Sequence, residues 1–181
     1  MLKILAAIML VLPMAAMADE GPAVGTMAPA VHATDLAGKP VSLKALSAKN
    51  GVVVLFFRSA KWCPYCQAQL IAFRDATPAL ASRGYNLVAV SYDPPEVLTR
   101  FTEARMINYP LLSDAGSTTI DAWGLRDPQY KPDSIAYGVP RPAIFVISKT
   151  GRIDAKLMMD GYKVRPSVDA VVAAVDALGR H

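Results

Sequence analysis

The stretch VVVLFFRSAKWCPYCQAQL, residues 52–70, decides the fold. It opens with a continuous run of β-branched, aliphatic and aromatic residues, which is typical of a strand buried on both faces of a sheet. A helix is predicted to begin at about Cys63, with Pro64 in its first turn, where a missing N–H costs little. Such a strand delivers the start of the next helix to the carboxyl edge of the sheet, where reaction sites of open α/β sheets collect. The only two cysteines of the chain, Cys63 and Cys66, are therefore expected at a reactive position.

The rest of the chain continues to alternate between strand and helix patterns. The predicted strands are residues 52–57, 85–92, 111–112, 143–148 and 153–159, and the predicted helices are residues 63–83, 94–106, 118–123 and 167–178. A polar excursion at residues 127–137 precedes the last two strands, which form a hairpin. This order predicts an α/β fold with a mixed central sheet, helices on both faces and right-handed crossovers. Pro78 predicts a kink in the first long helix.

The first residues, MLKILAAIMLVLPMAAMADE, have the pattern of a secretory leader. Lys3 is followed by a short apolar run, and Ala16-Met17-Ala18 is a small-x-small cleavage site. The run is too short to span a bilayer, and an uncleaved anchor helix is the less favoured alternative. We expect residues 1–18 to be a signal peptide and residues 19–181 to form a single domain without a stable membrane anchor. Export, with the periplasm as the expected destination, would place the cysteines where a disulfide can persist.

Charge and motifs limit the classes of partner. The net charge of +4 is mild and the basic residues are scattered, so a nucleic-acid partner is not expected. The sequence has no phosphate loop or dinucleotide-binding motif, so no cofactor is expected and electrons must come from a thiol protein or a small thiol. Asp93, Asp114 and Asp133 follow apolar segments and are predicted to be solvated turn residues.

Cys63 is predicted to be the reactive thiol. A helix N-terminus carries partial positive charge and unpaired N–H groups, and Lys61 adds a nearby charge, so the pKa of the Cys63 thiol should be lowered. Cys66 lies about one turn deeper on the same side, where it can attack a mixed disulfide at Cys63 and release the product. Trp62 and Tyr65 would form an apolar surround that receives a partner chain.

Three other uses of a cysteine pair fit the sequence less well. A structural disulfide with this spacing closes a very small loop and gains little chain entropy. A zinc site needs about four ligands, and His32 and His181 stand near opposite ends of the mature chain. Covalent haem attachment needs a histidine directly after the second cysteine, where Gln67 stands. Dithiol redox chemistry is therefore favoured, and no metal is expected.

Four stretches together resemble the alkyl hydroperoxide reductase/thiol-specific antioxidant family, the peroxiredoxin-like branch of the thioredoxin superfamily. They are VVVLFFRSAKWCPYCQAQL, YNLVAVSYDPPEVLTRFTEA, YPLLSD and VPRPAIFVISKTGRI, and the similarity extends from about Pro29 to Leu178. The resemblance implies a thioredoxin-like (redoxin) fold and thiol-dependent, antioxidant redox activity.

The resemblance also assigns roles to individual residues. Cys63 matches the reactive cysteine and Cys66 the second cysteine of a thioredoxin-type CPxC motif. Pro142 stands where thioredoxin-like proteins place a cis-proline that faces the active cysteines, with Pro140 as the alternative. A cis bond at Pro142 would expose the backbone of Arg141 for pairing with a substrate strand.

The sequence departs from the peroxiredoxin pattern just before the reactive cysteine. Peroxiredoxins resemble one another there in a Pro-x-x-x-Thr/Ser-x-x-Cys stretch, and this chain has Phe56 and Ala60 at the proline and hydroxyl positions. Arg58 and Arg141 remain available to stabilise a thiolate or a peroxide. A cysteine of low pKa beside a second thiol can still be oxidised to a sulfenate and resolved as a disulfide.

These observations leave three functions open. The first is an exported thiol–disulfide oxidoreductase of the redoxin type, in which Cys63 and Cys66 exchange a disulfide with client or partner thiols. The second is a thiol peroxidase that reduces a hydroperoxide at Cys63 and is reset by a thioredoxin-like partner. The third is a non-catalytic binding module whose cysteine pair is a structural bridge. The CPYC turn and Pro142 favour the first function, while the peroxiredoxin-like framework and Arg58 keep the second one open.

Overall fold

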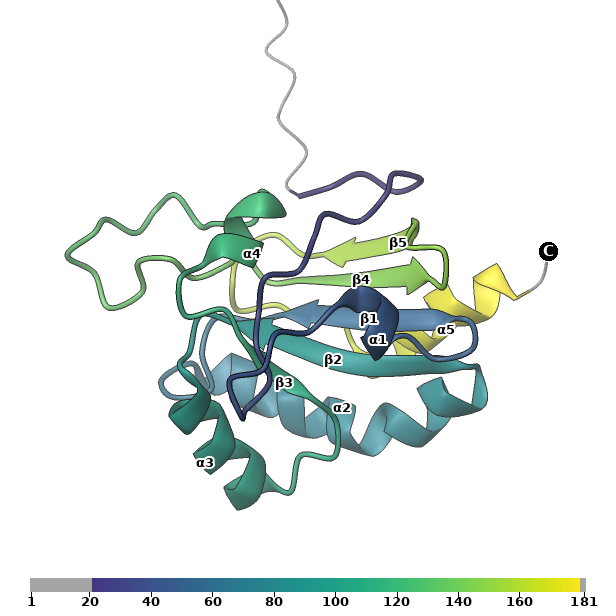
Figure 1. Cartoon of the computed structure of the whole chain (residues 1–181), viewed down its shortest axis with the longest axis horizontal. Helices are drawn as coiled ribbons and strands as arrows, with labels where there is room; N and C mark the ends of the chain where they lie inside the picture. Colours follow the sequence, from purple (N-terminus) through teal and green to yellow (C-terminus); the bar gives the residue numbers. More distant parts are fainter. Residues whose placement is uncertain (1–20, 180–181) are drawn as a thin grey trace, which may run out of the picture.

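A mixed sheet organises residues 21–179, the part of the chain that the computed structural model describes (Figure 1). The strands are β1 (Gly51–Phe56), β2 (Tyr85–Ser91), β3 (Leu111–Ser113), β4 (Ala143–Ser148) and β5 (Ile153–Met158), in the spatial order β3-β2-β1-β4-β5. β1, β2 and β3 run parallel, β4 is antiparallel to β1, and β5 is antiparallel to β4. The predicted mixed sheet is confirmed. The predicted leader, residues 1–18, lies outside the described residues.

Helices cover both faces of this sheet, as the sequence predicts. They are α1 (Leu43–Leu46), α2 (Pro64–Ser82), α3 (Pro95–Arg105), α4 (Thr118–Ala122) and α5 (Val168–Leu178). On one face, α2, α3 and α5 contribute Leu70, Leu98 and Val171 to a shared hydrophobic core. On the other face, Ile120 of α4 and the neighbouring Trp123 pack against the sheet, and α1 lies over the same side (Figure 1).

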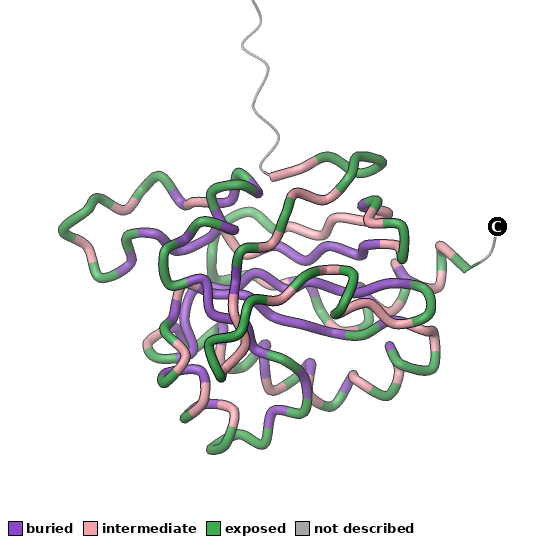
Figure 2. Tube along the Cα trace, viewed as in Figure 1, coloured by how far each residue is buried: buried purple, intermediate pink, exposed green. Residues whose placement is uncertain are grey.

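β1 connects the two hydrophobic cores because its side chains alternate between the faces of the sheet. Val53 and Leu55 belong to the core under α2, while Val54 and Phe56 belong to the core on the opposite face. Every residue of the strand is buried, and Figure 2 shows the centre of the sheet as the most continuously buried part of the chain. Each of these side chains contributes about 1.5 to 3 kcal/mol of burial free energy, so the strand that leads to the cysteines is firmly held.

α2 runs as one helix through Pro78, where the sequence predicts a kink. A proline has no N–H for the carbonyl four residues earlier, which here belongs to Arg74. The hydroxyl of Thr77 donates to that carbonyl at 3.0 Å and so supplies the missing hydrogen bond. The helix therefore continues to Ser82 despite the proline.

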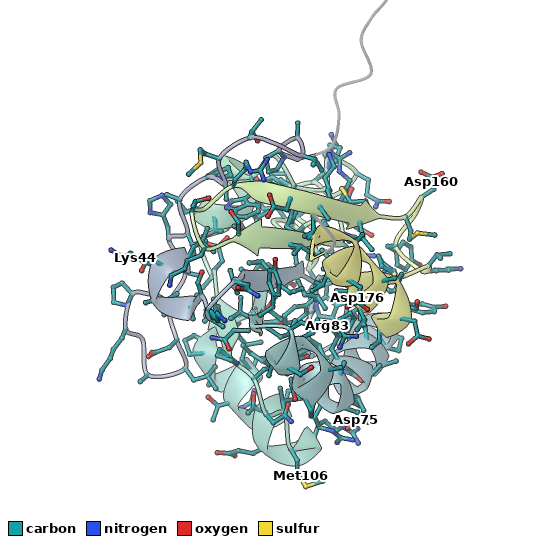
Figure 3. The ribbon with its side chains drawn as sticks, turned by 90° about the vertical axis from the view of Figure 1, so that its right-hand side faces the viewer. Lys44, Asp75, Arg83, Met106, Asp160 and Asp176 are labelled. Carbon is teal, nitrogen blue, oxygen red and sulfur yellow. A yellow bond between two sulfur atoms is a disulfide. The ribbon has the colours of Figure 1, made fainter. Side chains whose placement is uncertain are left out.

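The far end of α2 is tied to the last helix. Arg83 follows α2, and its guanidinium forms a bidentate ion pair with Asp176 of α5, at 2.6 and 3.0 Å. Figure 3 shows the two residues side by side. This pair anchors α5 against α2 at the end of the molecule that is remote from the cysteines. Among the described helices, none is both long and apolar enough to cross a membrane.

Candidate active site

The cysteine pair lies at the start of α2, directly after the buried central strand. Cys63 is the N-cap of the helix and Pro64 its first residue, as predicted. The sulfur of Cys63 accepts a hydrogen bond from the N–H of Cys66 at 3.2 Å, and the two residues form a disulfide. Both are buried, with exposed fractions of 2% and 0%. A helix N-terminus stabilises negative charge, so this position favours the thiolate of Cys63 when the disulfide is reduced.

The turn before the cysteines is built around a buried carboxylate, that of Asp93. Its oxygens accept hydrogen bonds from the hydroxyl of Ser59 at 2.8 Å, the N–H of Ala60 at 2.6 Å and the hydroxyl of Ser91 at 3.1 Å. Burial raises the pKa of Asp93, and the three hydrogen bonds oppose that rise. The prediction that Asp93 is a solvated turn residue is wrong, because its side chain organises the active-site turn from the end of β2.

The prediction that Asp114 is a solvated turn residue is also wrong. It is buried, and its carboxylate accepts hydrogen bonds from the N–H groups of Thr119 and Ile120 in the first turn of α4. Asp133, in contrast, is exposed as predicted.

Arg58 is buried among aromatic rings beside the active-site turn. Its guanidinium carbon lies 5.1 Å from the ring centre of Trp62, 4.9 Å from that of Tyr130 and 4.4 Å from that of Tyr162. It also donates a hydrogen bond to the hydroxyl of Tyr130. Only 2% of Arg58 is exposed, and its Nε is buried without a hydrogen-bond partner. Among residues 21–179, Arg58 thus lies in a cation–π cluster and has no ion pair with a carboxylate.

The two aromatic residues of the motif point to different surroundings. The indole N–H of Trp62 donates to the hydroxyl of Tyr92 at 2.9 Å, and this hydroxyl donates to the carbonyl of Ile135 at 2.7 Å. Tyr65 is 42% exposed, and its ring makes an edge contact with that of Tyr162, with ring centres 6.1 Å apart. Trp62 is therefore tied to the excursion before β4, and Tyr65 forms part of the exposed rim.

The segment between β5 and α5 lies against the cysteines, which the sequence does not predict. We call residues 159–166 the covering segment. Its Arg165 places Nη2 at 3.6 Å from the sulfur of Cys66 and 4.0 Å from that of Cys63. Its Tyr162 contacts both Arg58 and Tyr65. The covering segment therefore brings a second arginine and a ring to the site.

Arg141 and Pro142 lie to one side of this arrangement. They line a cavity of about 290 Å³ together with Asp127, Gln129 and Tyr162. None of the described peptide bonds is cis, so the predicted cis-proline at Pro142, or at Pro140, is wrong. The N–H of Arg141 donates to the carbonyl of Leu125 at 2.7 Å. The backbone at this position is thus occupied by the chain itself and is not presented to a substrate strand.

A second hollow lies on the helix side of the site, lined by Tyr65 and Arg165. It is a groove of about 500 Å³ between α2 and the start of α5, and its lining is mostly apolar, with Tyr65, Phe73 and Val168 among its residues. Arg165 stands at the same groove. The described residues contain no cluster of three or more side chains of the kind that holds a metal ion.

Comparison with known proteins decides the family. The family model described as AhpC/TSA matches residues 24–156, which is more than half of the chain. This chain belongs to the AhpC/TSA family. It is 33% identical over 129 residues to "Putative peroxiredoxin MT2597" of Mycobacterium tuberculosis (strain CDC 1551 / Oshkosh), a match that covers 71% of this chain and 80% of the relative. It is 27% identical over 148 residues to peroxiredoxin Bcp of Escherichia coli (strain K12), covering 82% and 92% of the two chains.

A solved structure agrees with this membership. Peroxidoxin BcpB from Mycobacterium tuberculosis superposes on this AhpC/TSA protein with a TM-score of 0.74 and 25% sequence identity, and the match covers 86% of this chain and 97% of the other. The fold is therefore thioredoxin-like, and the protein is a thiol-based oxidoreductase. The comparisons do not assign roles to the residues around the cysteines.

Several residues of the site carry no signal in the sequence. Arg165 and Tyr162 are distant from Cys63 in the chain, and nothing around them resembles a motif. Tyr130 lies in a polar excursion that the sequence marks only as a loop. Asp93 could have been found, because a carboxylate that directly follows a buried parallel strand lies at the same sheet edge as the cysteines.

Proposed function

We propose that this AhpC/TSA protein is a thiol peroxidase that reduces hydroperoxides at Cys63, with Cys66 as the resolving thiol. The observation that carries the proposal is the cysteine pair itself, bonded at the N-terminus of α2 in a chain of peroxiredoxin relatives. Peroxidase activity was the second of the three functions that the sequence left open. The relatives favour it over thiol–disulfide exchange with client proteins.

The reaction balances with the two thiols alone. The thiolate of Cys63 attacks one oxygen of the hydroperoxide, the O–O bond breaks, and an alkoxide leaves and takes a proton from water to become the alcohol. The sulfur of Cys63 loses two electrons and becomes a sulfenic acid. The thiolate of Cys66 then attacks this sulfur, hydroxide leaves, and the Cys63–Cys66 disulfide forms. Because Cys66 is bonded to Cys63 within one helical turn, resolution requires no movement of distant chain.

A thiol donor must return the disulfide to the dithiol, and either a thioredoxin-like protein or a small thiol would serve. One donor thiolate attacks a sulfur of the pair, and a second donor thiol releases the mixed disulfide, so the donor leaves oxidised. The sulfur of Cys63 is buried beside the covering segment. A protein donor therefore requires the contact between Tyr65 and Tyr162 to open, whereas a small thiol requires less movement.

Export of the protein is a further part of the proposal, supported by the leader pattern of residues 1–18. The secreted form is expected to begin at Asp19, and mass spectrometry of protein taken from the periplasm of an expressing bacterium would measure its N-terminus. A chain that retains Lys3 would contradict cleavage.

Thiol–disulfide exchange at the same pair is the second candidate function. The absence of a hydroxyl at Ala60 favours it, because the nearby hydroxyl of Ser59 is engaged with Asp93 and does not replace the missing one. Exchange needs a reactive thiol at a helix N-terminus and a neighbouring thiol, and the positions of Cys63 and Cys66 meet that need.

Stopped-flow tryptophan fluorescence tests the peroxidase directly. The fully reduced protein would be mixed with hydrogen peroxide and, separately, with cumene hydroperoxide. A Cys66→Ser variant would be run beside it with dimedone, a reagent that traps sulfenic acid. We expect oxidation far faster than that of free cysteine, with dimedone addition at Cys63 in the variant. Oxidation at the rate of free cysteine, together with rapid reduction of a test protein disulfide, would instead support the exchange function.

A further inference from the structure

The guanidinium of Arg165 is the charged group in contact with both reactive sulfurs. Its Nη2 lies 3.6 Å from the sulfur of Cys66 and 4.0 Å from that of Cys63. Its Nη1 donates to the carbonyls of Tyr162 and Val164, so the covering segment holds its own arginine in place. Pro166, which is buried, and the N-cap Ser167 then lead directly into α5. The guanidinium of Arg165 is therefore held by carbonyls of its own segment, and its backbone is held by the start of α5.

No negative group among the described residues balances this charge. Arg165 makes no ion pair with a carboxylate there, and its Nε is buried without a hydrogen-bond partner. Burial and, to a smaller extent, the nearby charge of Arg58 together lower the pKa of Arg165 to about 10. The group still carries its proton at neutral pH. A half-buried cation without a counter-charge is costly, and an anion placed next to it would offset that cost.

The sulfur of Cys63 becomes such an anion when the disulfide is reduced. The hydroxyl that peroxiredoxins place three residues before the reactive cysteine is missing, since Ala60 stands there. Arg58 is engaged by three rings and by the hydroxyl of Tyr130. Arg165 is thus the arginine whose guanidinium meets the sulfurs.

We propose that Arg165 is a catalytic residue, which stabilises the thiolate of Cys63 and the negative charge that passes to the departing alkoxide. This inference rests on the peroxidase proposed above and adds a residue to it. In the step S⁻ + HOOR → SOH + ⁻OR, one unit of negative charge moves from the sulfur to the leaving oxygen. A cation beside the sulfur favours the reactive form beforehand and remains close to the charge during transfer. The arginine is supplied by the covering segment and not by the CPYC helix.

Other charged or titratable groups around Cys63 must be considered in any pH experiment. They are Arg58 and Lys61 before the helix, Tyr65 within it, Asp93 under the turn, Tyr130 in the excursion, Tyr162 and Lys163 in the covering segment, and Asp169 at the start of α5. Lys163 offers the matched control, since it is an exposed cation of the same segment and its nitrogen lies over the ring of Tyr162, at 6.0 Å.

The test compares Arg165→Gln, Arg165→Lys and Lys163→Gln. In a Cys66→Ser background, the pH dependence of alkylation would report the pKa of the Cys63 thiol alone. We expect Arg165→Gln to raise this pKa by about one unit or more, toward the free value of about 8.5. With both cysteines present, peroxide oxidation at neutral pH should slow by about tenfold to a hundredfold. Arg165→Lys should bring the thiol pKa most of the way back to the wild-type value. Lys163→Gln should leave the thiol pKa close to the wild-type value and the oxidation rate within about twofold of it.

Two results would overturn the role of Arg165. One is an Arg165→Gln protein with an unchanged thiol pKa and an unchanged oxidation rate. The other is an equal effect from Lys163→Gln, which would show that general charge, and not contact, is responsible. Far-UV circular dichroism would confirm that each variant is folded, and if Arg165→Gln is not, Arg165→Met, which also removes the charge, takes its place in the same comparison. Failure of the peroxidase itself is distinguishable, because the wild-type protein would then oxidise at the rate of free cysteine whatever its thiol pKa.

Discussion

Two segments meet at the disulfide, and they differ in how they reach it. The turn and helix start of residues 57–66 come to the site through local structure, because the buried strand β1 ends there and Cys63 caps α2. The covering segment, residues 159–166, comes from the other end of the sequence and reaches the sulfurs only because β5 and α5 are packed beside β4 and α2. The first segment supplies the reacting atoms, and the second supplies Arg165 and Tyr162, which surround them.

The difference indicates a division of roles. Both cysteines are buried, the N–H of Cys66 donates to the sulfur of Cys63, and Asp93 anchors the preceding turn through Ser59 and Ala60, so the nucleophile is held in one geometry. The covering segment is largely exposed, and its contacts with the turn are one ring contact, one cation–π contact and the guanidinium above the sulfurs. Segments with few buried contacts open at low free-energy cost. The reactive group is therefore fixed, and its cover is the part that can move.

The largest effect is expected from the reacting atom itself. Cys63→Ser should abolish oxidation by peroxide, since an unactivated serine hydroxyl is not a comparable nucleophile. Cys66→Ser should retain the first oxidation step and accumulate a sulfenic acid or a mixed disulfide at Cys63. Mass spectrometry after exposure to one equivalent of peroxide distinguishes the two variants. Full turnover by Cys63→Ser would refute the assignment of the nucleophile.

The next effect comes from the support of the turn. Asp93→Ala leaves the N–H of Ala60 and the hydroxyls of Ser59 and Ser91 without their acceptor. We expect it to lower the free energy of unfolding by about 2 to 3 kcal/mol. Asp133→Ala is the control, because Asp133 is an exposed aspartate in a loop, and its change should stay within about 0.5 kcal/mol. Urea denaturation followed by circular dichroism measures both, and equal effects would contradict a supporting role for Asp93.

A smaller effect is expected from the covering segment. Tyr162→Ala removes the ring that contacts Arg58 and Tyr65 and should cost about 1 kcal/mol of stability. It should also speed reduction of the disulfide by a protein dithiol more than reduction by a small thiol, because the cover is looser. Tyr137→Ala is the matched control: Tyr137 is exposed and lies 4.9 Å from the guanidinium of Arg126, in a cation–π pair of its own.

If Tyr162→Ala leaves the ratio of the two reduction rates unchanged, the covering segment does not restrict access to the sulfurs. An increase in that ratio for Tyr137→Ala as well would show that the effect does not depend on the position of the ring.

The smallest expected effect is the pH dependence due to Asp93. Its folded-state pKa lies above the ordinary value of 3.8, so the folded protein retains a proton that the unfolded chain has lost. The stability from this group is complete below the ordinary value and decreases as the pH rises through the raised pKa. Asp93→Asn should remove this part of the slope, as denaturation curves at several acidic pH values would show. An identical slope in wild type and Asp93→Asn would contradict the raised pKa.

The sequence predicts what is local in this molecule. Buried strands, helix starts and the position of Cys63 follow from short patterns, because hydrophobic runs and caps determine them directly. Asp93 was misjudged because its partners, Ser59 and Ala60, belong to a neighbouring strand end; its place after a buried parallel strand predicts the sheet edge but not these hydrogen bonds.

The remaining errors also arise from distant contacts. Pro142 follows Arg141, whose N–H is bonded to the carbonyl of Leu125, and a motif match cannot show this pairing. Arg165 reaches the sulfurs through the packing of α5 on α2, which is a property of the whole fold. The nucleophile could be predicted from sequence, and its surroundings could not.

A single-turnover experiment tests the central claim most directly. The fully reduced protein would be mixed with an equal amount of cumene hydroperoxide, and the cumyl alcohol formed would be compared with the Cys63–Cys66 disulfide formed. The account predicts one molecule of alcohol for each disulfide, within the first seconds of mixing and in the absence of any other thiol. Disulfide formation without alcohol, or alcohol without loss of the two thiols, would contradict hydroperoxide reduction by this cysteine pair.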